Sequence, residues 1–385
     1  MDRNYYPVII IGGGASGLFL KHLLPHALLI EKNKECGRKL LLTGGGECNI
    51  TQDEEIKSFV AHYNNKKRFV SPCLYSFPPE KLISYFNSLG ANLFTRSDGK
   101  VFPSSHDSRT IRDLLLTKEG IYTNTNVLAI SKEDRFIVST DKGNYSSDIL
   151  VLATGGASYP ATGSTGDGYA FAKQLGHKIV PLQAALSQIK VDFNTHPLEG
   201  LSLSDVTLTY KKKRYRGDIL FTSRSLSGPL ALNLSREIDG SEVITLSFTT
   251  VEDGKLKELN GKMNVLNAIH NITNLPSRLI AYLFESIKDK NVASLTKADL
   301  ALIKNQLTAF SFKGSTKGEL KYGMSTRGGI DTDEIDSKTF QSKITSNLYA
   351  IGEVLDVDAD CGGYSLTFAF ASAYAASKAI KEKLN

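Results

Sequence analysis

The chain has few of the residues that mark metal, disulfide and membrane proteins. It has no tryptophan, and only 3 methionines and 4 cysteines among 385 residues. The cysteines (Cys36, Cys48, Cys73 and Cys361) form no Cys-x-x-Cys pair, so we predict neither a metal site nor a disulfide framework. No apolar run reaches the roughly 18 residues of a membrane span. The first residues lack the apolar core of a signal peptide, so we expect a cytoplasmic protein without membrane association.

The bulk composition is that of an ordinary globular protein. Hydrophobic residues make up 41% and charged residues 22% of the chain. A chain of this length is expected to form two or three domains. The formal net charge of +6 permits an anionic partner but requires none, and nothing in the composition specifies an oligomeric state.

The strongest motif lies near the N-terminus. The apolar run Val8 to Ile11 leads directly into Gly12-x-Gly14-x-x-Gly17, which predicts a buried parallel strand, a phosphate-binding turn and a helix. The first glycine allows the tight turn, the second a close approach of a pyrophosphate, and the third packing of the helix on the strand. The pyrophosphate would bind the free amides at the helix N-terminus.

A second apolar run supports this interpretation. Residues Ala27 to Ile30 end in Glu31, which follows Gly12 by 19 residues, and an acidic residue at this place typically binds a ribose hydroxyl. The alternative is a glycine-rich turn in an ordinary α/β domain.

Further glycine clusters follow strand-like runs. Gly44-Gly45-Gly46 predicts a loop lying against a ligand or, alternatively, a plain flexible loop. A short strand at 144–146 and a separate strand at 148–153 are expected before Thr154-Gly155, and a strand at 347–351 ends in Gly352-Glu353. Gly363 and Tyr364 precede an alanine-rich helix over 366–383, whose positive end could stabilise a reduced flavin; the alternative is a capped packing helix.

The composition of the chain and the spacing of its apolar residues change between these glycine-rich blocks. We predict a discontinuous dinucleotide-binding domain over 1–185 and 336–385. An inserted β domain is expected over 186–250 and 308–335, and a small helical subdomain over 251–307, where apolar residues have helical spacing.

Four blocks carry a resemblance that covers nearly the whole chain: IIIGGGASGL, GRKLLLTGGGECNIT, ATGGASYPATGSTGDGYAFAKQLGH and LYAIGEVLDVDADCGGYSLTFAFASAYAAS. The first and last are common among glutathione-reductase-like flavoproteins, and the middle two are more specific. With these blocks the chain resembles the BaiN/RdsA (YhiN-like) family of FAD-dependent oxidoreductases. The resemblance implies an α/β fold: a glutathione-reductase-like, FAD-binding Rossmann domain with an inserted β-barrel-like domain and a small helical domain.

The motifs and the resemblance together give the expected FAD contacts. These are Gly12, Gly14, Ala15, Ser16, Gly17, Glu31, Lys32, Arg38, Lys39, Gly44, Gly45, Gly46, Cys48, Asn49, Val127, Ala153, Thr154, Gly155, Gly352, Glu353, Gly363, Tyr364, Ser365 and Leu366. Arg38 and Lys39 could equally be solvated. The chain departs from the family in having Glu47 in place of an arginine and Ser365 in place of an asparagine, and the first change reverses a charge near the cofactor.

The motifs restrict the classes of flavin reaction that the chain is expected to catalyse. Position 53 is Asp, so Cys48 lacks the partner that a disulfide reductase of this fold needs. A second Gly-x-Gly-x-x-Gly is absent, so NAD(P)H, the candidate transient electron donor, would visit the flavin without a dedicated domain. The first hypothesis is an enzyme that reduces a C=C or C=N bond, and the family resemblance includes reduction of uracil in ribosomal RNA to dihydrouridine. Cys48 is one conceivable catalytic acid, although a packed residue is the commoner role.

Two other functions remain open. One is an amine oxidase that passes electrons from a small primary amine to oxygen, with Tyr159 and Tyr364 as aromatic neighbours of the amine. The other is a flavin-binding protein without turnover. The substrate is accordingly a small molecule or RNA. If it is RNA, the basic run 211–216 would contact phosphates; otherwise this run is a solvated hairpin tip.

Overall fold

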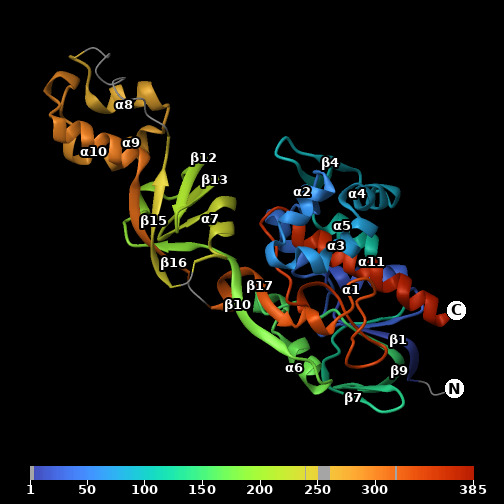
Figure 1. Ribbon diagram of the computed structural model, residues 1–385. Helices are drawn as coiled ribbons and strands as arrows, with labels where there is room; N and C mark the ends of the chain where they lie inside the picture. Colours follow the sequence, from blue (N-terminus) through green and yellow to red (C-terminus); the bar gives the residue numbers. More distant parts are fainter. Residues whose placement is uncertain (1–3, 239, 250–260, 317–318) are drawn as a thin grey trace. The chain divides into compact units, whose positions relative to one another are not determined.

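The computed structural model describes residues 4–238, 240–249, 261–316 and 319–385, and the chain forms two compact units (Figure 1). The first unit comprises Met1–Ala185 and Glu319–Asn385, and the second comprises Leu186–Gly318. Residues 319–335, expected in the inserted β domain, therefore belong to the first unit. Their strand β17 (Gly323–Ile330) pairs with β10 (Ile179–Ser187), a partner that a strand-like sequence does not reveal.

The first unit is built around one mixed sheet in the order β6-β2-β1-β9-β8-β7, with β18 also paired to β9. The bounds are β1 Tyr5–Ile11, β2 Leu28–Ile30, β6 Ile121–Tyr122, β7 Val127–Lys132, β8 Phe136–Thr140, β9 Gly143–Leu152 and β18 Leu348–Ala350. In the centre of the sheet, β1 pairs parallel with β2 and with β9, and β9 pairs parallel with β18; residues 8–11 of β1 are fully buried there. Such burial on both faces explains the unbroken β-branched run.

Strand β9 is one continuous strand rather than the two expected. Its first half pairs antiparallel with β8, as in Phe136 opposite Ser147. Its second half pairs parallel with β18, as in Leu150 opposite Leu348. The strand thus joins the antiparallel ribbon to the parallel sheet and carries Ala153 and Thr154 to the carboxyl end of that sheet.

Helices α1 (Ala15–Leu23) and α11 (Tyr364–Leu384) come from opposite ends of the chain and pack together. The ring of Phe19 meets that of Phe370 edge to face, with centroids 5.2 Å apart. The remaining helices of this unit are α2 Ile56–Ala61, α3 Lys67–Ser76, α4 Pro79–Ser88, α5 Arg109–Leu115 and α6 Asp167–Gln174. A small sheet, β3-β5-β4, consists of Thr51–Gln52, Lys100–Pro103 and Leu93–Thr95.

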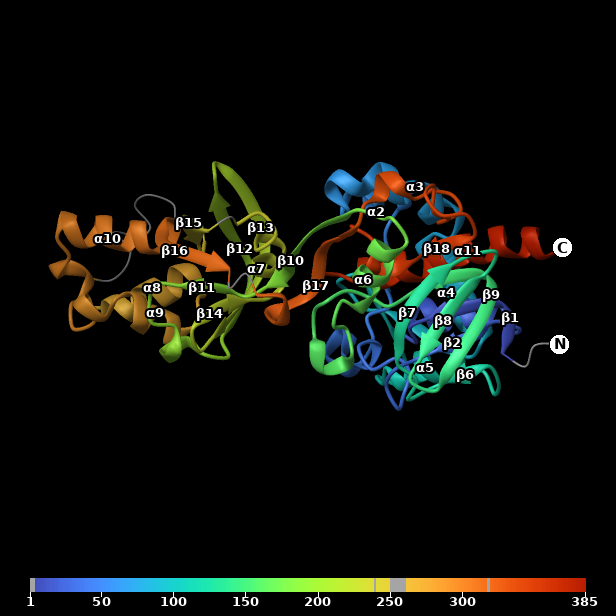
Figure 2. The same ribbon diagram turned by 90° about the horizontal axis from the view of Figure 1, so that it is seen from below.

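The second unit contains a closed six-stranded barrel in the order β11-β14-β13-β12-β15-β16. The bounds are β11 Ile189–Val191, β12 Ser202–Tyr210, β13 Lys213–Thr222, β14 Ser225–Ser227, β15 Ser241–Ser247 and β16 Phe310–Thr316. Its helices are α7 Pro229–Leu234, α8 Val265–Thr273, α9 Ser277–Leu283 and α10 Lys297–Thr308. Within this unit, α8, α9 and α10 lie together beyond one end of the barrel (Figure 2).

The barrel and these three helices share one apolar core, to which Ile244 of β15, Ile269 of α8 and Leu279 of α9 contribute. The expected α/β fold with an inserted β-barrel is confirmed. Part of the expected helical segment, residues 251–260, lies outside the described residues. No helix in the described ranges is long and apolar enough to cross a membrane.

Candidate functional site

The glycine turn between β1 and α1 has the geometry that the motif predicts. A Cβ atom at Gly12 would lie 2.5 Å from the carbonyl oxygen of Ala153, and one at Gly17 would lie 1.9 Å from the carbonyl oxygen of Gly12. Both positions therefore require glycine. Gly14 differs, because a Cβ there would meet no atom within 4 Å, and no side chain caps the helix that follows it. Open space next to uncapped backbone amides suits a pyrophosphate.

The carboxylate of Glu31, directly after β2, is bonded to the glycine turn itself. Its Oε2 accepts a hydrogen bond from the amide of Gly13 at 2.7 Å. Its Oε1 accepts bonds from the amide and the side chain of Asn33, at 2.8 and 2.6 Å. A carboxylate has about four acceptor positions, so one remains for a ribose hydroxyl.

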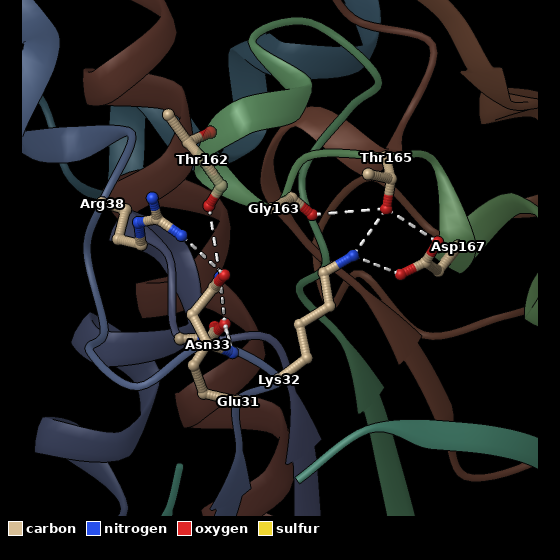
Figure 3. Close-up of polar contacts among 9 residues, drawn as sticks. Glu31, Lys32, Asn33, Arg38, Thr162, Gly163, Thr165 and Asp167 are labelled. Atoms are coloured by element: carbon tan, nitrogen blue, oxygen red, sulfur yellow. Dashed lines mark hydrogen bonds and ion pairs between the residues drawn. The ribbon is translucent and has the colours of Figure 1, made fainter. Parts of the chain in front are cut away.

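Residues after β2 are also tied to the segment 162–167, as Figure 3 shows. Lys32 forms an ion pair with Asp167 and donates to Thr165. Asn33 donates to the carbonyl of Thr162 and accepts from Arg38. Lys32 and Arg38 thus contact protein groups at the end of the site expected to hold the adenosine.

Two further predicted residues border this end. The backbone amide of Thr125, two residues before Val127, donates to the carbonyl of Glu31 at 3.0 Å. Val127 begins β7 next to this contact and is buried. Thr154 lies beneath the glycine turn, and its buried Oγ1 has no hydrogen-bond partner among the described residues.

Lys39 and Glu353 form the polar centre between the two ends of the site. The ammonium of Lys39 lies 2.9 and 2.8 Å from the two carboxylate oxygens of Glu353 and also donates to Ser158 at 2.6 Å. The carboxylate of Glu353 additionally accepts from the amide of Thr326 at 2.9 Å. The preceding Gly352 faces α1, since a Cβ there would lie 2.7 Å from the hydroxyl of Ser16.

The triple-glycine loop adopts left-handed backbone conformations, with φ of 58°, 70° and 99° at Gly44, Gly45 and Gly46. A Cβ at either of the last two would meet nothing within 4 Å, so the loop has open space beside it. Asn49, just beyond, has a buried Oδ1 with no partner among the described residues. A buried acceptor of this kind is costly unless a ligand donates to it.

Cys48 is brought to this loop, but its thiol is fully buried. Burial raises its pKa to about 12, although a hydrogen bond involving Thr43 acts in the opposite direction. Such a thiol is a poor proton donor at neutral pH.

The N-terminus of α11 meets the segment that follows this loop. A Cβ at Gly363 would lie 2.8 Å from the backbone of Thr51, and the hydroxyl of Thr367 donates to that of Thr51 at 2.8 Å. Tyr364, Ser365 and Leu366 form the first turn of the helix at this junction. A polar cluster around Tyr364 includes His62, which sequence reasoning missed because α2 and α3 carry no motif.

These features fit FAD: open space at glycines, uncapped helix amides, and an orphaned buried oxygen at Asn49. FAD, when bound, supplies the acceptor and donor of a hydride. In the described part of the chain, no group of His, Cys, Asp and Glu side chains is placed to hold a metal ion.

Comparisons with known proteins agree with this geometry. The family model described as "HI0933-like protein Rossmann domain" matches residues 6–379. A ribosomal RNA dihydrouridine synthase of Escherichia coli is 29% identical over 98% of both chains. A 3-dehydro-bile acid delta(4,6)-reductase of Clostridium scindens is 29% identical, covering 97% of this chain and 98% of the relative. The open conformation of a flavocytochrome c3 fumarate reductase shares the fold, with TM-score 0.56 and 16% identity over 100% of this chain and 79% of that one.

Proposed function

This chain belongs to the HI0933-like Rossmann family, and from that premise we propose that it reduces a carbon–carbon double bond, with uracil of ribosomal RNA as substrate and NAD(P)H as transient donor. The protein is an FAD-dependent flavoprotein oxidoreductase. The observation that carries the proposal is the full-length match to two relatives whose names both describe reductions, one of uridine and one of a bile acid. Dihydrouridine differs from uridine by one hydride and one proton added across C5=C6.

The choice of RNA rests on a weaker feature, the basic hairpin between β12 and β13. Three of its basic side chains pair with acidic neighbours: Lys211 with Glu242, Lys213 with Glu237, and Arg216 with Asp205. Lys212 and Arg214 are exposed on the same hairpin. Exposed ion pairs of this kind are weak and are screened by salt, so phosphates can compete for these cations.

NAD(P)H is proposed as a transient donor because of the number of dinucleotide-binding motifs in the chain. The chain contains one Gly-x-Gly-x-x-Gly turn, and the site built on it accounts for FAD. A nicotinamide nucleotide would then bind transiently, deliver its hydride and leave.

The test is anaerobic stopped-flow absorbance of the yellow, FAD-loaded protein. We expect NADH or NADPH to bleach the flavin band and small primary amines to leave it unchanged. The reduced protein is then mixed with unmodified ribosomal RNA transcript or with 2-cyclohexen-1-one, and return of the band identifies a double-bond acceptor. Bleaching by an amine, with peroxide formed on admission of oxygen, would instead establish an amine oxidase. A purified protein that takes up no FAD would contradict the site itself.

A further inference from the structure

Four titratable side chains, Glu54, His62, Asp360 and Tyr364, form a connected group that we call the His62 cluster. The Nδ1 atom of His62 lies 2.8 Å from Oδ2 of Asp360, and its Nε2 lies 3.3 Å from Oε1 of Glu54. The hydroxyl of Tyr364 donates to the same Glu54 oxygen at 2.8 Å. The ring of Tyr364 stacks on the imidazole, with centroids 4.1 Å apart and planes at 22°. The cluster thus joins two stretches of the first unit, residues 54–62 and 360–364.

The cluster lies beside the part of the site expected to hold the flavin ring. Tyr364 directly follows Gly363, which packs on the backbone of Thr51, and Glu54 is three residues beyond Thr51. His62 stands at the C-terminal end of α2, with 32% of its side chain exposed. Its partners therefore hold the imidazole in place, while about a third of the side chain remains accessible.

The surroundings of His62 favour its protonated form. Burial lowers its pKa, but the hydrogen bond to Asp360 and the negative charges of Glu54 and Asp360 outweigh burial and raise the pKa above its usual value. Tyr364 contacts the ring as a neutral phenol, because burial and its bond to Glu54 raise the pKa of its hydroxyl. Cys361, the residue after Asp360, also stays neutral, since burial raises the pKa of its thiol.

We propose that His62 donates the proton of the reduction, with Asp360 and Tyr364 as positioning residues that fix the imidazolium. This inference rests on the proposed function. The π bond of the substrate breaks, one carbon receives the hydride and its neighbour receives the proton from Nε2 of His62. The N–H bond of the imidazolium breaks in that step, and solvent reprotonates the ring through its exposed side.

The geometry distinguishes the two ring nitrogens. Asp360 holds Nδ1 at 2.8 Å, which orients the ring, whereas the contact of Nε2 with Glu54 is longer, at 3.3 Å. A nitrogen with the longer contact is the one freer to release its proton to a reactant. The other donors are less suited, since Cys48 is fully buried and the hydroxyl of Tyr364 is committed to Glu54.

The experiment compares two acceptors for the dithionite-reduced, FAD-loaded protein. The first is whichever double-bond acceptor, RNA transcript or 2-cyclohexen-1-one, reoxidises the wild type faster; the second is ferricyanide, which takes electrons without a protein-bound proton donor. We expect His62→Gln to slow the first reaction about 100-fold and to leave the second unchanged. His106→Gln is the matched control, because His106 also lies near a carboxylate, 3.4 Å from Glu47, in the same unit. It should affect neither reaction.

A second readout needs no turnover. NMR titration of the His62 ring should give a pKa above the usual histidine value in the wild type and a lower one in Asp360→Asn, because the variant removes a negative charge. The rate with the double-bond acceptor should fall as pH rises through that pKa, and in Asp360→Asn the fall should begin at lower pH.

Three results would overturn the inference. Equal slowing of both acceptors by His62→Gln would indicate a structural role, and slowing of neither would indicate no role. If the pKa of the His62 ring is the same in Asp360→Asn as in the wild type, Asp360 is not a positioning residue. If no double-bond acceptor reoxidises the wild type, the proposed function falls and takes this inference with it, whereas the first three results leave that function intact.

Discussion

Lys39 and Glu353 are 314 residues apart in the sequence and form an ion pair in which Nζ lies 2.8 Å from Oε2. Each side chain is 22% exposed, so the pair is largely removed from solvent. It joins the segment before the triple-glycine loop to the turn after β18, two blocks that both border the expected FAD site. The pair therefore links an N-terminal segment of the first unit to a C-terminal segment of the same unit.

Replacing Lys39 by alanine should destabilise the protein by about 1–2 kcal/mol, less than for a fully buried pair because both groups keep some solvent contact. The cost arises because the Glu353 carboxylate loses its countercharge and keeps only its bonds from Ser158 and Thr326. Urea unfolding followed by circular dichroism measures it. Lys32→Ala is the matched control: its partner Asp167 is 41% exposed, so we expect a smaller loss. Equal losses in both variants would contradict this ranking.

Substitutions at two glycines of the first turn should have different effects, one on folding and the other on cofactor binding. Gly17→Ala places a Cβ atom 1.9 Å from a backbone oxygen and should destabilise the fold by about 1–3 kcal/mol or more. Gly14→Ala meets no protein atom and should keep the wild-type melting temperature without cofactor. It should nevertheless weaken FAD binding about tenfold or more, roughly 1.4 kcal/mol, because the added methyl group occupies the expected place of the pyrophosphate. Thermal melts and flavin fluorescence titration measure the two effects, and normal FAD affinity in Gly14→Ala would contradict the placement.

The buried cysteines should be inert. Burial, with a smaller contribution from Glu31, raises the pKa of Cys36 to about 12, and burial raises that of Cys48 to about 12. Thiolates react with iodoacetamide and neutral thiols do not, so mass spectrometry after treatment at pH 8 should find both unmodified in the native protein. Denaturation in urea should expose them to labelling. Cys48→Ala should keep double-bond reduction, and a large loss in that variant would restore Cys48 as the proton donor.

Acid should weaken the second unit through Asp299. Hydrogen bonds from Lys290 and Thr296 lower the pKa of its carboxyl to about 2 from the usual 3.8. A lowered folded-state pKa contributes stability that is present above the unfolded value and is lost as pH falls from about 4 toward 2. Asp299→Asn should therefore unfold at lower urea concentration than the wild type at pH 6, and the difference should shrink as pH approaches 2. A difference independent of pH would refute this linkage.

Much of the fold was predictable because the relevant preferences are local. The run Val8 to Ile11 followed by Gly12-x-Gly14-x-x-Gly17 specifies strand, turn and helix within ten residues, and Glu31 directly follows the next strand, which pairs with the first. The inserted β domain expected over 186–250 likewise contains β12, β13 and β15 of the barrel. In each case, backbone geometry and side-chain alternation are set by neighbours in the chain.

Helices α2 and α3 were missed for a physical reason. Helix α3 contains Pro72 and is amphipathic only over a short length, so its local sequence does not clearly indicate a helix. Packing against α11 and the central core stabilises it instead, with Val70 and Leu74 fully buried.

Local patterns predicted the glycine turn and its acidic partner, because both depend on contacts within a short stretch of chain. Other contacts form through tertiary packing: Lys39 meets Glu353, β17 pairs with β10, and His62 lies between Glu54 and Asp360. These contacts join segments from distant parts of the chain. Their partners are selected by the packing of whole elements into a common core, which no local pattern encodes.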